Sequence, residues 1–386
     1  MTNEKILELV NENFDEIKQI RRQIHMNPEI GNKEFKTKAF IISCLEKWNI
    51  EHFEVLDTAV VGIIKGDGDK VIALRADMDA LPITENTTCE FSSQNQGYMH
   101  ACGHDLHVAS LLGAAKILSE HRHELKGTIK LFFQPDEEGS GGAKRMIEAG
   151  VMQNPTVNKV FGVHIAPELE FDVVAVKHGQ SYASSDIFNI DIAGKSAHGA
   201  QPHLGIDSVL VGAQIITALQ SIVARNIDPT NSAVLTIGKF SGGTVRNAIA
   251  KSARIEGIFR TLSREDRITI REKLVAITES IASSFGAKAT VTFIPSYDAV
   301  INHDNETDFI ANCAKDLFGE DKLLVLKKPT MTSEDFGFFL NDTEGSFYHV
   351  GVSSPHPLHS DKLLPNENAL KTITAMHVKS VLEYLK

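Results

Sequence analysis

Apolar residues recur along the first half of the chain in two rhythms, which predict two kinds of element. Residues 3–24 and 34–48 carry apolar side chains at the three- and four-residue spacing of an amphipathic helix, and 108–118 is also helix-like. Short runs rich in apolar and β-branched residues, typical of buried strands, lie at 60–64, 71–76, 129–134 and 160–163. Strands interleaved with helices predict a mixed-sheet α/β sandwich.

The order of elements changes near residue 182. From there the pattern predicts, in order, strand 186–193, helix 206–226, strands 232–240 and 251–260, helix 264–285 and strand 288–294. This β-α-β-β-α-β order is the ferredoxin-like arrangement, with its hairpin turn expected at Ser241-Gly242-Gly243. Later helices at 305–319, 333–340 and 366–385, and strands at 323–327 and 346–351, resume the first rhythm. We therefore predict a main domain of residues 1–181 and 296–386, interrupted by a ferredoxin-like α+β domain of residues 182–295.

Composition narrows the class of protein. At 386 residues, two domains are the first expectation. The 39 basic and 50 acidic side chains give a net charge of -11, which argues against binding the phosphate backbone of nucleic acid. The sequence has no signal-peptide pattern and no run of 18 apolar residues, so we expect no membrane partner. Four scattered cysteines are unlike a disulfide framework and favour a cytoplasmic protein with reduced thiols.

The segment Met99 to His107 concentrates the candidate chemistry. It holds three imidazoles, a thiol and a carboxylate within nine residues, a density of borderline-soft ligands that suggests a transition-metal site. Three other segments support this interpretation over incidental histidines: Gln134 to Gly139, Gly162-Val163-His164 and His356 to Ser360. The first two of these lie at the ends of predicted strands, where open α/β sheets place their ligand sites.

Two pairs of carboxylates follow predicted strands. Glu137 and Glu138 are consecutive, and neighbouring side chains in extended backbone face opposite ways, so one can hold a metal while the other takes a proton from water. A solvated turn is the plain alternative. Asp77 and Asp79 share one face at period two, where one of them can orient a ligand histidine, unless they form a simple ion-pair cluster with Arg75.

Together these motifs resemble the amidohydrolase branch of the dinuclear metallopeptidase family, which includes aminoacylases, hippurate hydrolases, auxin-conjugate hydrolases and N-acetyldiaminopimelate deacetylases. The resemblance spans nearly the whole chain. Its signatures, in order, are His25 to Glu29, Arg75 to Pro82, His100 to Asp105, Pro135 to Glu138, Ser196 to Gly199, Ser333 to Phe336 and His359. It implies a metallohydrolase main domain.

The resemblance also implies roles for individual residues. Two divalent ions, of Zn, Mn, Co or Ni, would be held by five ligands: Cys102, His104, Glu138, His164 and His359. Glu137 would be the general base, and Asp79 would orient a ligand. Asp77 stands where peptidase branches carry a ligand histidine, so its role stays open. The remaining histidines of these motifs, His100, His107 and His356, match no ligand position and are interpreted as structural or surface residues.

In this family the inserted domain carries the dimer interface. A histidine at the position of His198 would reach into the partner's active site and stabilise the oxyanion. Asn247 and Arg260 match positions near the substrate, where a guanidinium can grip the carboxylate of an acyl amino acid. The backbone amides of the Gly351-Val352 turn would contact the same carboxylate. We therefore expect a homodimer through the inserted domain.

The sequence thus predicts a metal-dependent amidohydrolase that cleaves small N-acyl amino acids, hippurate-like or N-acetylated, to a carboxylate and a free amino acid. N-acetyldiaminopimelate deacetylation is an alternative within the class. A dipeptidase or other exopeptidase is the nearest rival, although Cys102 and Asp77 weigh against it. A non-catalytic metal-binding module is the rival from another class, and a module of that kind has no need of Glu137.

Overall fold

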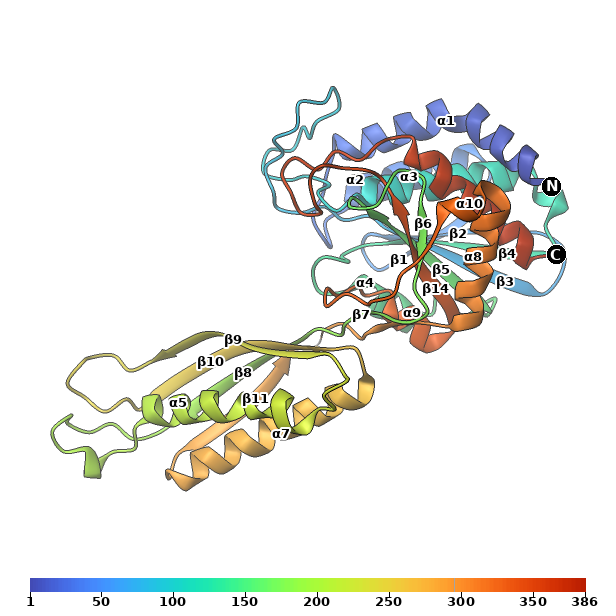
Figure 1. Ribbon diagram of the computed structural model, residues 1–386. Helices are drawn as coiled ribbons and strands as arrows, with labels where there is room; N and C mark the ends of the chain where they lie inside the picture. Colours follow the sequence, from blue (N-terminus) through green and yellow to red (C-terminus); the bar gives the residue numbers. More distant parts are fainter. Residues whose placement is uncertain (295) are drawn as a thin grey trace. The chain divides into compact units, whose positions relative to one another are not determined.

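A computed structural model describes residues 1–294 and 296–386, which divide into two compact units (Figure 1). The main unit comprises residues 1–179, 301–328 and 335–386, and the inserted unit comprises 180–300 and 329–334. The chain first enters the inserted unit within β7 (Gly179–Tyr182) and first returns to the main unit within β12 (Val300–Asn302).

The main unit is built on an eight-stranded mixed sheet in the order β1-β2-β4-β3-β5-β14-β6-β13. Its strands are β1 (Glu51–Val55), β2 (Ala59–Lys65), β3 (Lys70–Asp77), β4 (Gly127–Gln134), β5 (Lys159–Ala166), β6 (Val174–Val176), β13 (Leu323–Val325) and β14 (Glu344–Gly351). The central strands are apolar over nearly their full length because helices cover both faces of the sheet.

Parallel pairing brings the candidate chemistry to one edge of this sheet. Strand β3 lies parallel to both β4 and β5, with Asp77 opposite Gln134 and Arg75 opposite Gly162. The carboxyl ends of these strands therefore meet at one edge, which is the usual place for a ligand site in an open α/β sheet. In β14, the next parallel strand, His349 lies opposite His164.

Helices form a layer on each face of the main sheet (Figure 1). They are α1 (Asn3–His25), α2 (Phe35–Lys47), α3 (His104–Glu120), α4 (Gly142–Glu148), α8 (Asp304–Phe318), α9 (Gly337–Asp342) and α10 (Ala369–Tyr384). Helices α1, α3 and α10 pack together over the core that contains Leu131 and Phe133 of β4. Phe132, which points the other way, stacks on Phe339 of α9, and α9 packs against α4.

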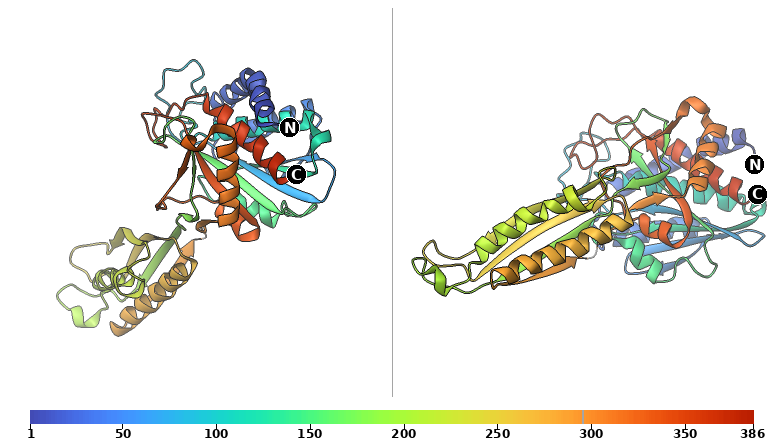
Figure 2. Two further views of the ribbon diagram at one scale, coloured as in Figure 1. Left: turned by 45° about the vertical axis from the view of Figure 1, so that its right-hand side comes forward. Right: turned by 60° about the horizontal axis from the view of Figure 1, so that its bottom comes forward.

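The inserted unit has the predicted ferredoxin-like order. Its elements are β8 (Asp186–Ala193), α5 (Ser208–Leu219), α6 (Ser221–Asn226), β9 (Ala233–Gly242), β10 (Ser252–Thr261), α7 (Arg264–Ser284) and β11 (Lys288–Ile294). The antiparallel sheet runs β11-β8-β10-β9, and α5 and α7 lie along one of its faces (Figure 2). Apolar side chains such as Phe188, Ile215 and Leu274 fill the space between helices and sheet.

The mixed α/β fold class is confirmed, and several details differ from the predictions. Strands β1 and β6 and helix α4 were missed because each is short. The predicted helix 206–226 breaks at Gln220 into α5 and α6, and the hairpin turn expected at Ser241-Gly242-Gly243 is instead a loop that follows Gly242. Short 3-10 turns lie at Arg122–Glu124, Pro202–Leu204 and Glu320–Lys322.

The observed unit boundaries lie close to the predicted domain boundaries. The first crossing falls two residues before the predicted one, and residue 295 lies outside the described residues. Residues 329–334, expected in the main domain, belong to the inserted unit. The amide of Thr330 donates to the carbonyl of Ser181, and that of Ala183 donates to the carbonyl of Thr332, which ties the segment there.

The apolar stretch Ser208–Asn226 has the length and composition of a membrane-spanning helix. Its inner face packs on the sheet of the inserted unit, where Val211, Ile215 and Leu219 are buried. Such packing is typical of a helix in a globular domain.

Candidate metal centre

Three of the predicted ligands, Cys102, Glu138 and His359, lie in turns. His104 is the first residue of α3, and His164 lies near the end of β5. Cys102 and His104 flank Gly103, which has φ of +83° immediately before α3. A Cβ at Gly103 would lie 2.2 Å from Cδ1 of Ile165 in β5. Only glycine fits this left-handed turn, and the turn places both ligands beside the strand that carries His164.

The structure brings the five predicted ligands together in the main unit. The Sγ atom of Cys102 lies 3.4 Å from Nε2 of His164, and Nε2 of His359 lies 3.0 Å from Oε1 of Glu138. One ligand atom each of Cys102, His104 and Glu138 lies within 4.8 Å of the others. Thiol, imidazole and carboxylate donors at this spacing fit divalent transition metals.

The two buried histidines of this group present the nitrogen that a cation needs. Nδ1 of His104 lies 2.9 Å from the carbonyl oxygen of Asp79, and Nδ1 of His164 lies 2.7 Å from that of Ile165. Each Nδ1 must therefore carry the proton, which leaves Nε2 as the free lone pair. Nε2 of His104 is buried and has no hydrogen-bond partner among the described residues, an arrangement that a bound metal ion would satisfy.

Electrostatics favour a cation at this place. Burial alone would lower the pKa of His104, but the carboxylates of Asp77, Asp79 and Glu138 outweigh it and raise that pKa to about 10. Burial, together with the charges of Glu138 and Glu137, raises the pKa of the Cys102 thiol well above its usual value. The local excess of negative charge is what a divalent cation would neutralise, and its charge would also deprotonate the thiol.

Asp79 holds neighbouring residues of the site in position through hydrogen bonds. Its carboxylate accepts hydrogen bonds from the backbone amides of Glu137, at 3.1 Å, and Glu138, at 3.0 Å, and its carbonyl accepts the proton of His104. These hydrogen bonds hold one predicted ligand and the glutamate pair together, and the role of Asp79 in orienting a metal ligand stays a prediction.

The glutamate pair does not lie in extended backbone as the sequence suggested. Strand β4 ends at Gln134, and Glu137 and Glu138 lie in a turn. The turn, rather than strand alternation, separates their side chains. Glu138 joins the ligand group, whereas Glu137, also buried, is not part of the group formed with Cys102 and His104.

Asp136 organises this turn and was missed in the sequence. It has φ of +58°, and its Oδ2 accepts hydrogen bonds from Asn32, at 2.7 Å, and Arg145, at 3.0 Å. A Cβ at Gly31 or Gly139 would lie 2.0 or 2.2 Å from its Oδ1. The two glycines indicate that another atom lies close to their backbone, but the sequence does not show that this atom belongs to Asp136.

Glu34 supports the same turn from α2. Its Oε1 accepts a hydrogen bond of 2.9 Å from the backbone amide of Asp136, and the side chain is buried. Burial raises the pKa of the Glu34 carboxyl to about 7, assisted by the nearby charge of Asp79. Nothing in the sequence pattern distinguishes this glutamate from the surface glutamates around it.

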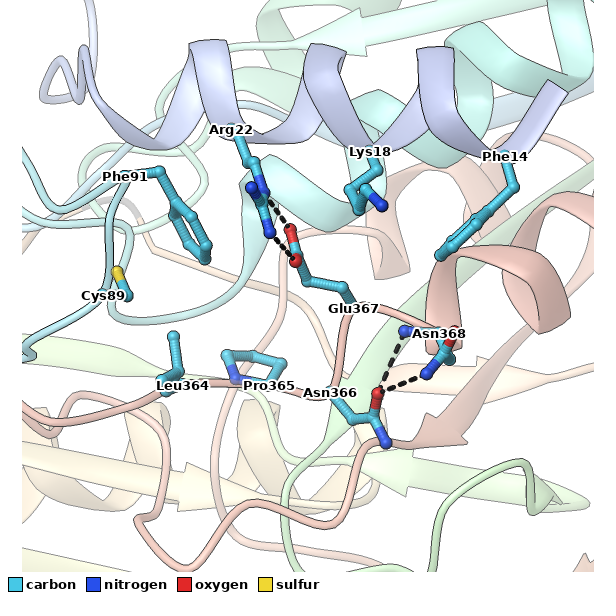
Figure 3. A pocket seen from close by; sticks show the side chains of 10 residues that line it. All are labelled: Phe14, Lys18, Arg22, Cys89, Phe91, Leu364, Pro365, Asn366, Glu367 and Asn368. Carbon is cyan, nitrogen blue, oxygen red and sulfur yellow. Dashed lines mark hydrogen bonds and ion pairs between the residues drawn. The ribbon is translucent and has the colours of Figure 1, made fainter.

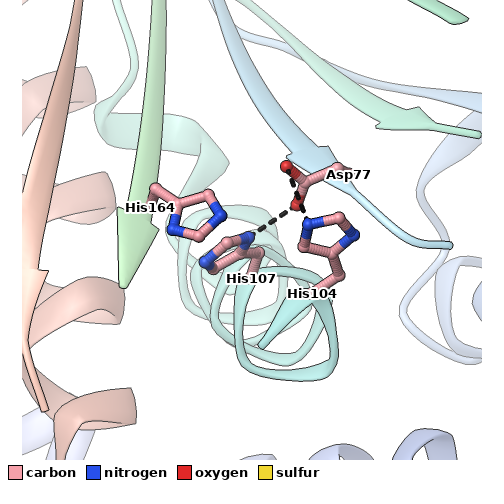
Figure 4. A group of neighbouring side chains, drawn as sticks. All are labelled: Asp77, His104, His107 and His164. Carbon is pink, nitrogen blue, oxygen red and sulfur yellow. Dashed lines mark hydrogen bonds and ion pairs between the residues drawn. The ribbon is translucent and has the colours of Figure 1, made fainter. Parts of the chain in front are cut away.

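Asp77, whose role was left open, binds structural partners (Figure 4). It lies 2.6 Å from a guanidinium nitrogen of Arg75 and 2.5 Å from Nδ1 of His107, while Nε2 of His107 accepts the amide of Ile165 at 3.0 Å. Both nitrogens of His107 are thus occupied, so a structural role fits it although it is grouped with His104 and His164. His107 and His100 are buried, so the surface interpretation is wrong for both.

Gly351, one of the predicted substrate residues, lies in the main unit, and the others lie in the inserted unit. His198, Asn247 and Arg260 belong to the inserted unit. A backbone bridge joins His198 to Ala248, which places the loops of His198 and Asn247 side by side, and Arg260 donates to the carbonyl of Met331 at 3.2 Å. Substrate contacts of these three residues stay predictions.

Gly351 needs a correction. Its amide donates to the carbonyl of Val173 at 2.8 Å, and the amide of Val352 donates to the carbonyl of Ala166 at 3.2 Å. Each amide has a single proton, which is used within the main unit. The predicted contact of these amides with a substrate carboxylate therefore does not fit this geometry.

Comparison with known proteins identifies the family. The model of peptidase family M20/M25/M40 matches residues 73–383, a stretch that contains all five predicted ligands. The chain belongs to peptidase family M20/M25/M40. It is therefore an M20 hydrolase, and the resemblance inferred from its motifs is confirmed.

Relatives of this M20 hydrolase are deacetylases. The N-acetyldiaminopimelate deacetylase of Priestia megaterium is 39% identical over 368 residues, which are 95% of this chain and 97% of the relative. The N-acetyl-L-cysteine deacetylase of Bacillus subtilis is 40% identical over 354 residues, 91% of this chain and 84% of the relative.

A solved structure agrees with this assignment. The Bacillus subtilis YXEP protein, a dinuclear metal-binding peptidase of the M20 family, has a TM-score of 0.85 at 33% identity and covers 97% of this chain and 99% of its own. This M20 hydrolase is accordingly an amidohydrolase with a candidate metal-ligand group.

Proposed function

We propose that this M20 hydrolase is a two-metal deacetylase that removes the acetyl group from N-acetylated amino acids. The observation that carries the proposal is the convergence of Cys102, His104 and Glu138 beside the buried Glu137. Relatives named for N-acetyldiaminopimelate and N-acetyl-L-cysteine favour acetyl substrates over the hippurate-like substrates expected from sequence. The mixed donor set suits Zn, Mn, Co and Ni alike, so any of these divalent ions fits the proposal.

The chain's own residues divide the work of amide hydrolysis. Two divalent ions held by the five ligands would polarise the amide carbonyl and lower the pKa of water. Glu137 takes a proton from the attacking water and delivers it to the amide nitrogen, so the C–N bond breaks to give acetate and a free amine. Asp79 keeps Glu137, Glu138 and His104 in register through the three hydrogen bonds described above.

We also propose that the enzyme is a cytoplasmic homodimer joined through the inserted unit. Strand β9 is an edge strand of its sheet, and Val234 on it is 40% exposed. Val209 and Leu210 on α5 are 37% and 48% exposed. An edge strand beside exposed apolar side chains favours pairing with a second copy, and the partner subunit's His198 would then stabilise the oxyanion, with Arg260 and Asn247 near the substrate carboxylate.

A panel of substrates tests the proposed reaction. Metal-loaded protein is given N-acetyldiaminopimelate, N-acetyl-L-cysteine, hippurate and a dipeptide, and release of free amine is followed. We expect kcat/KM for an acetylated amino acid to exceed those for hippurate and the dipeptide by about tenfold or more, a difference of about 1.4 kcal/mol in transition-state binding. Faster cleavage of the dipeptide would instead indicate an exopeptidase, and inertness towards all four would refute the proposal.

A further inference from the structure

A second group of potential metal ligands lies at the end of α1 and in the loop between β3 and α3. Nε2 of His25 is 3.3 Å from Oε1 of Glu85, and Sγ of Cys89 is 4.0 Å from the same oxygen. One ligand atom from each of the three residues lies within 4.8 Å of the others. None of the three belongs to the ligand set of the candidate metal centre.

The spacing of these atoms also fits one shared ion. A tetrahedral ion with nitrogen and oxygen ligands at about 2.1 Å and sulfur at about 2.3 Å separates its ligand atoms by roughly 3.3 to 3.7 Å. The His25–Glu85 distance of 3.3 Å falls within this range, and it is longer than the 2.8 Å between His25 and its other carboxylate partner, Asp105. The sulfur needs only a small movement to complete the group.

The outer atoms of these ligands are already held in place. Nδ1 of His25 bonds to Asp105, which is buried and held by Arg21 at 2.6 Å, so Nε2 is the nitrogen that faces Glu85. Oε2 of Glu85 accepts the amide of Ser93 at 2.6 Å, and Oε1, which also accepts the hydroxyl of Thr87, faces His25 and Cys89. A carboxylate behind a histidine ligand is the usual support in zinc sites.

One member of the group borders a pocket (Figure 3). Cys89 is half-buried and lines this pocket, which has a volume of about 460 Å³. Arg22 on the pocket wall pairs with Glu367 at 3.0 and 2.6 Å, so its charge is balanced locally. The pocket supplies both an entry path for a metal ion and water for a fourth ligand position.

We propose that His25, Glu85 and Cys89 form a third divalent-metal site, of the zinc class, which ties the loop before α3 to the end of α1. The loop leads directly into Cys102 and His104, and Asp105 follows them on α3, so the site braces the segment that carries two ligands of the candidate metal centre. This proposal does not depend on the reaction that the enzyme catalyses.

Thiol protection tests the site in the unmodified protein. The full chain is stripped with a chelator, treated with iodoacetamide in buffered zinc or without zinc, and alkylation of the Cys89 peptide is measured by mass spectrometry. We expect zinc to slow alkylation of Cys89 by about tenfold or more, because a coordinated thiolate is withdrawn from reaction. Glu85→Gln should lose this protection. Equal alkylation rates with and without zinc in the wild type would overturn the proposal.

Metal counting gives a second readout. Elemental mass spectrometry of zinc-loaded protein should find about three ions per chain in the wild type and about two in Cys89→Ala. Ser92→Ala is the matched control, because the Ser92 hydroxyl lies 3.4 Å from the same sulfur but belongs to no ligand group, and it should keep three. The same count in wild type and Cys89→Ala would contradict the third site, whatever the enzyme hydrolyses.

Discussion

Some buried polar side chains of the main unit have ion-pair partners, whereas others have no hydrogen-bond partner in the described part of the chain. Asp105 and Asp77 are fully buried, yet each lies between a guanidinium and an imidazole. His377 on α10 is equally buried, and neither ring nitrogen has a hydrogen-bond partner in the described part of the chain. Uncompensated groups of this kind should govern the pH dependence of stability.

Acid should destabilise the protein through His377. Burial lowers the pKa of His377 to about 3, so its imidazole stays neutral in the folded state while the unfolded chain takes up a proton below about pH 6.5. The folded state therefore loses stability as pH falls from 6.5 towards 3, by up to about 2 kcal/mol at pH 5. In urea titrations at pH 7.5 and 5, His377→Leu should lose less stability than the wild type.

His123, whose side chain is 74% exposed, provides the control for this measurement. His123→Leu should follow the wild type at both pH values. An identical acid-induced loss in His377→Leu and the wild type would exclude His377 as its source.

Glu34 should have the opposite pH dependence. Burial raises the pKa of its carboxyl to about 7, so the folded state keeps a proton that the unfolded chain releases near pH 4.5. Stability is therefore lost as pH rises from 4.5 through 7, by about 3 kcal/mol at most. Glu34→Gln imitates the protonated form, so it should keep deacetylation and be more stable than the wild type at pH 8 in urea titrations.

Glu34→Ala separates the hydrogen bond from the charge. It removes the acceptor for the amide of Asp136 and should reduce kcat, because the turn that carries Glu137 loses a support. Full kcat in Glu34→Ala would show that the turn does not depend on the hydrogen bond between Asp136 and Glu34.

At the scale of elements, the carboxyl ends of β3, β4 and β5 create the site, and the turns after them complete it. Helix α4 begins at Gly142, directly after the glutamate turn, and a Cβ there would lie 1.9 Å from the carbonyl oxygen of Pro135. Backbone on both sides of this contact is fixed, so the contact locks the Pro135 to Glu138 turn against α4.

Gly142→Ala should therefore displace the glutamate turn. We expect a loss of about 1 to 3 kcal/mol in stability from overpacking and at least tenfold weaker binding of metal, because Glu138 moves with the turn. Thermal unfolding and competition with a chelator measure the two effects. Gly238→Ala is the control, since the nearest heavy atom to its Cβ is 4.0 Å away, and equal metal affinity in both variants would contradict the locking contact.

Sequence reasoning succeeded where the signal is local. Apolar runs predicted β2 to β5, and clustered donor types indicated a metal site in the segment Met99 to His107. The individual ligands were implied by the family resemblance. The support of the site was not predictable in this way, because it joins distant segments: Asp136 bonds to Asn32, and Glu34 to the amide of Asp136, across about a hundred residues. The sequence pattern predicted extended backbone at the glutamate pair, because nothing in the residues around Asp136 indicates its positive φ.

At the scale of the whole molecule, we assign the chemistry to the main unit and the assembly to the inserted unit. The ligand group lies entirely within the main unit, while His198 lies in the inserted unit. If His198 acts on the partner's substrate, then assembly is required for turnover but not for metal binding. A variant that cannot dimerise should therefore bind metal normally but lose turnover.

Leu210→Glu, on the exposed face of α5, should give a monomer that keeps its metal but loses tenfold or more of its kcat, because the oxyanion loses about 1.4 kcal/mol or more of stabilisation. Size-exclusion chromatography with light scattering measures the assembly state, and acetate release measures kcat. Ile268→Glu on α7, where the side chain is 51% exposed, is the matched control and should remain dimeric. A fully active monomer would contradict the role proposed for His198.

In the proposed mechanism Glu137 moves the proton, while five side chains hold the metal: Cys102, His104, Glu138, His164 and His359. Metal content and acetate release are compared in the wild type and Glu137→Gln. We expect equal metal content and a loss of turnover of about 10²- to 10⁴-fold in Glu137→Gln, the usual contribution of a general base. Undiminished turnover in Glu137→Gln, or a metal-loaded wild type that releases no acetate, would contradict this mechanism.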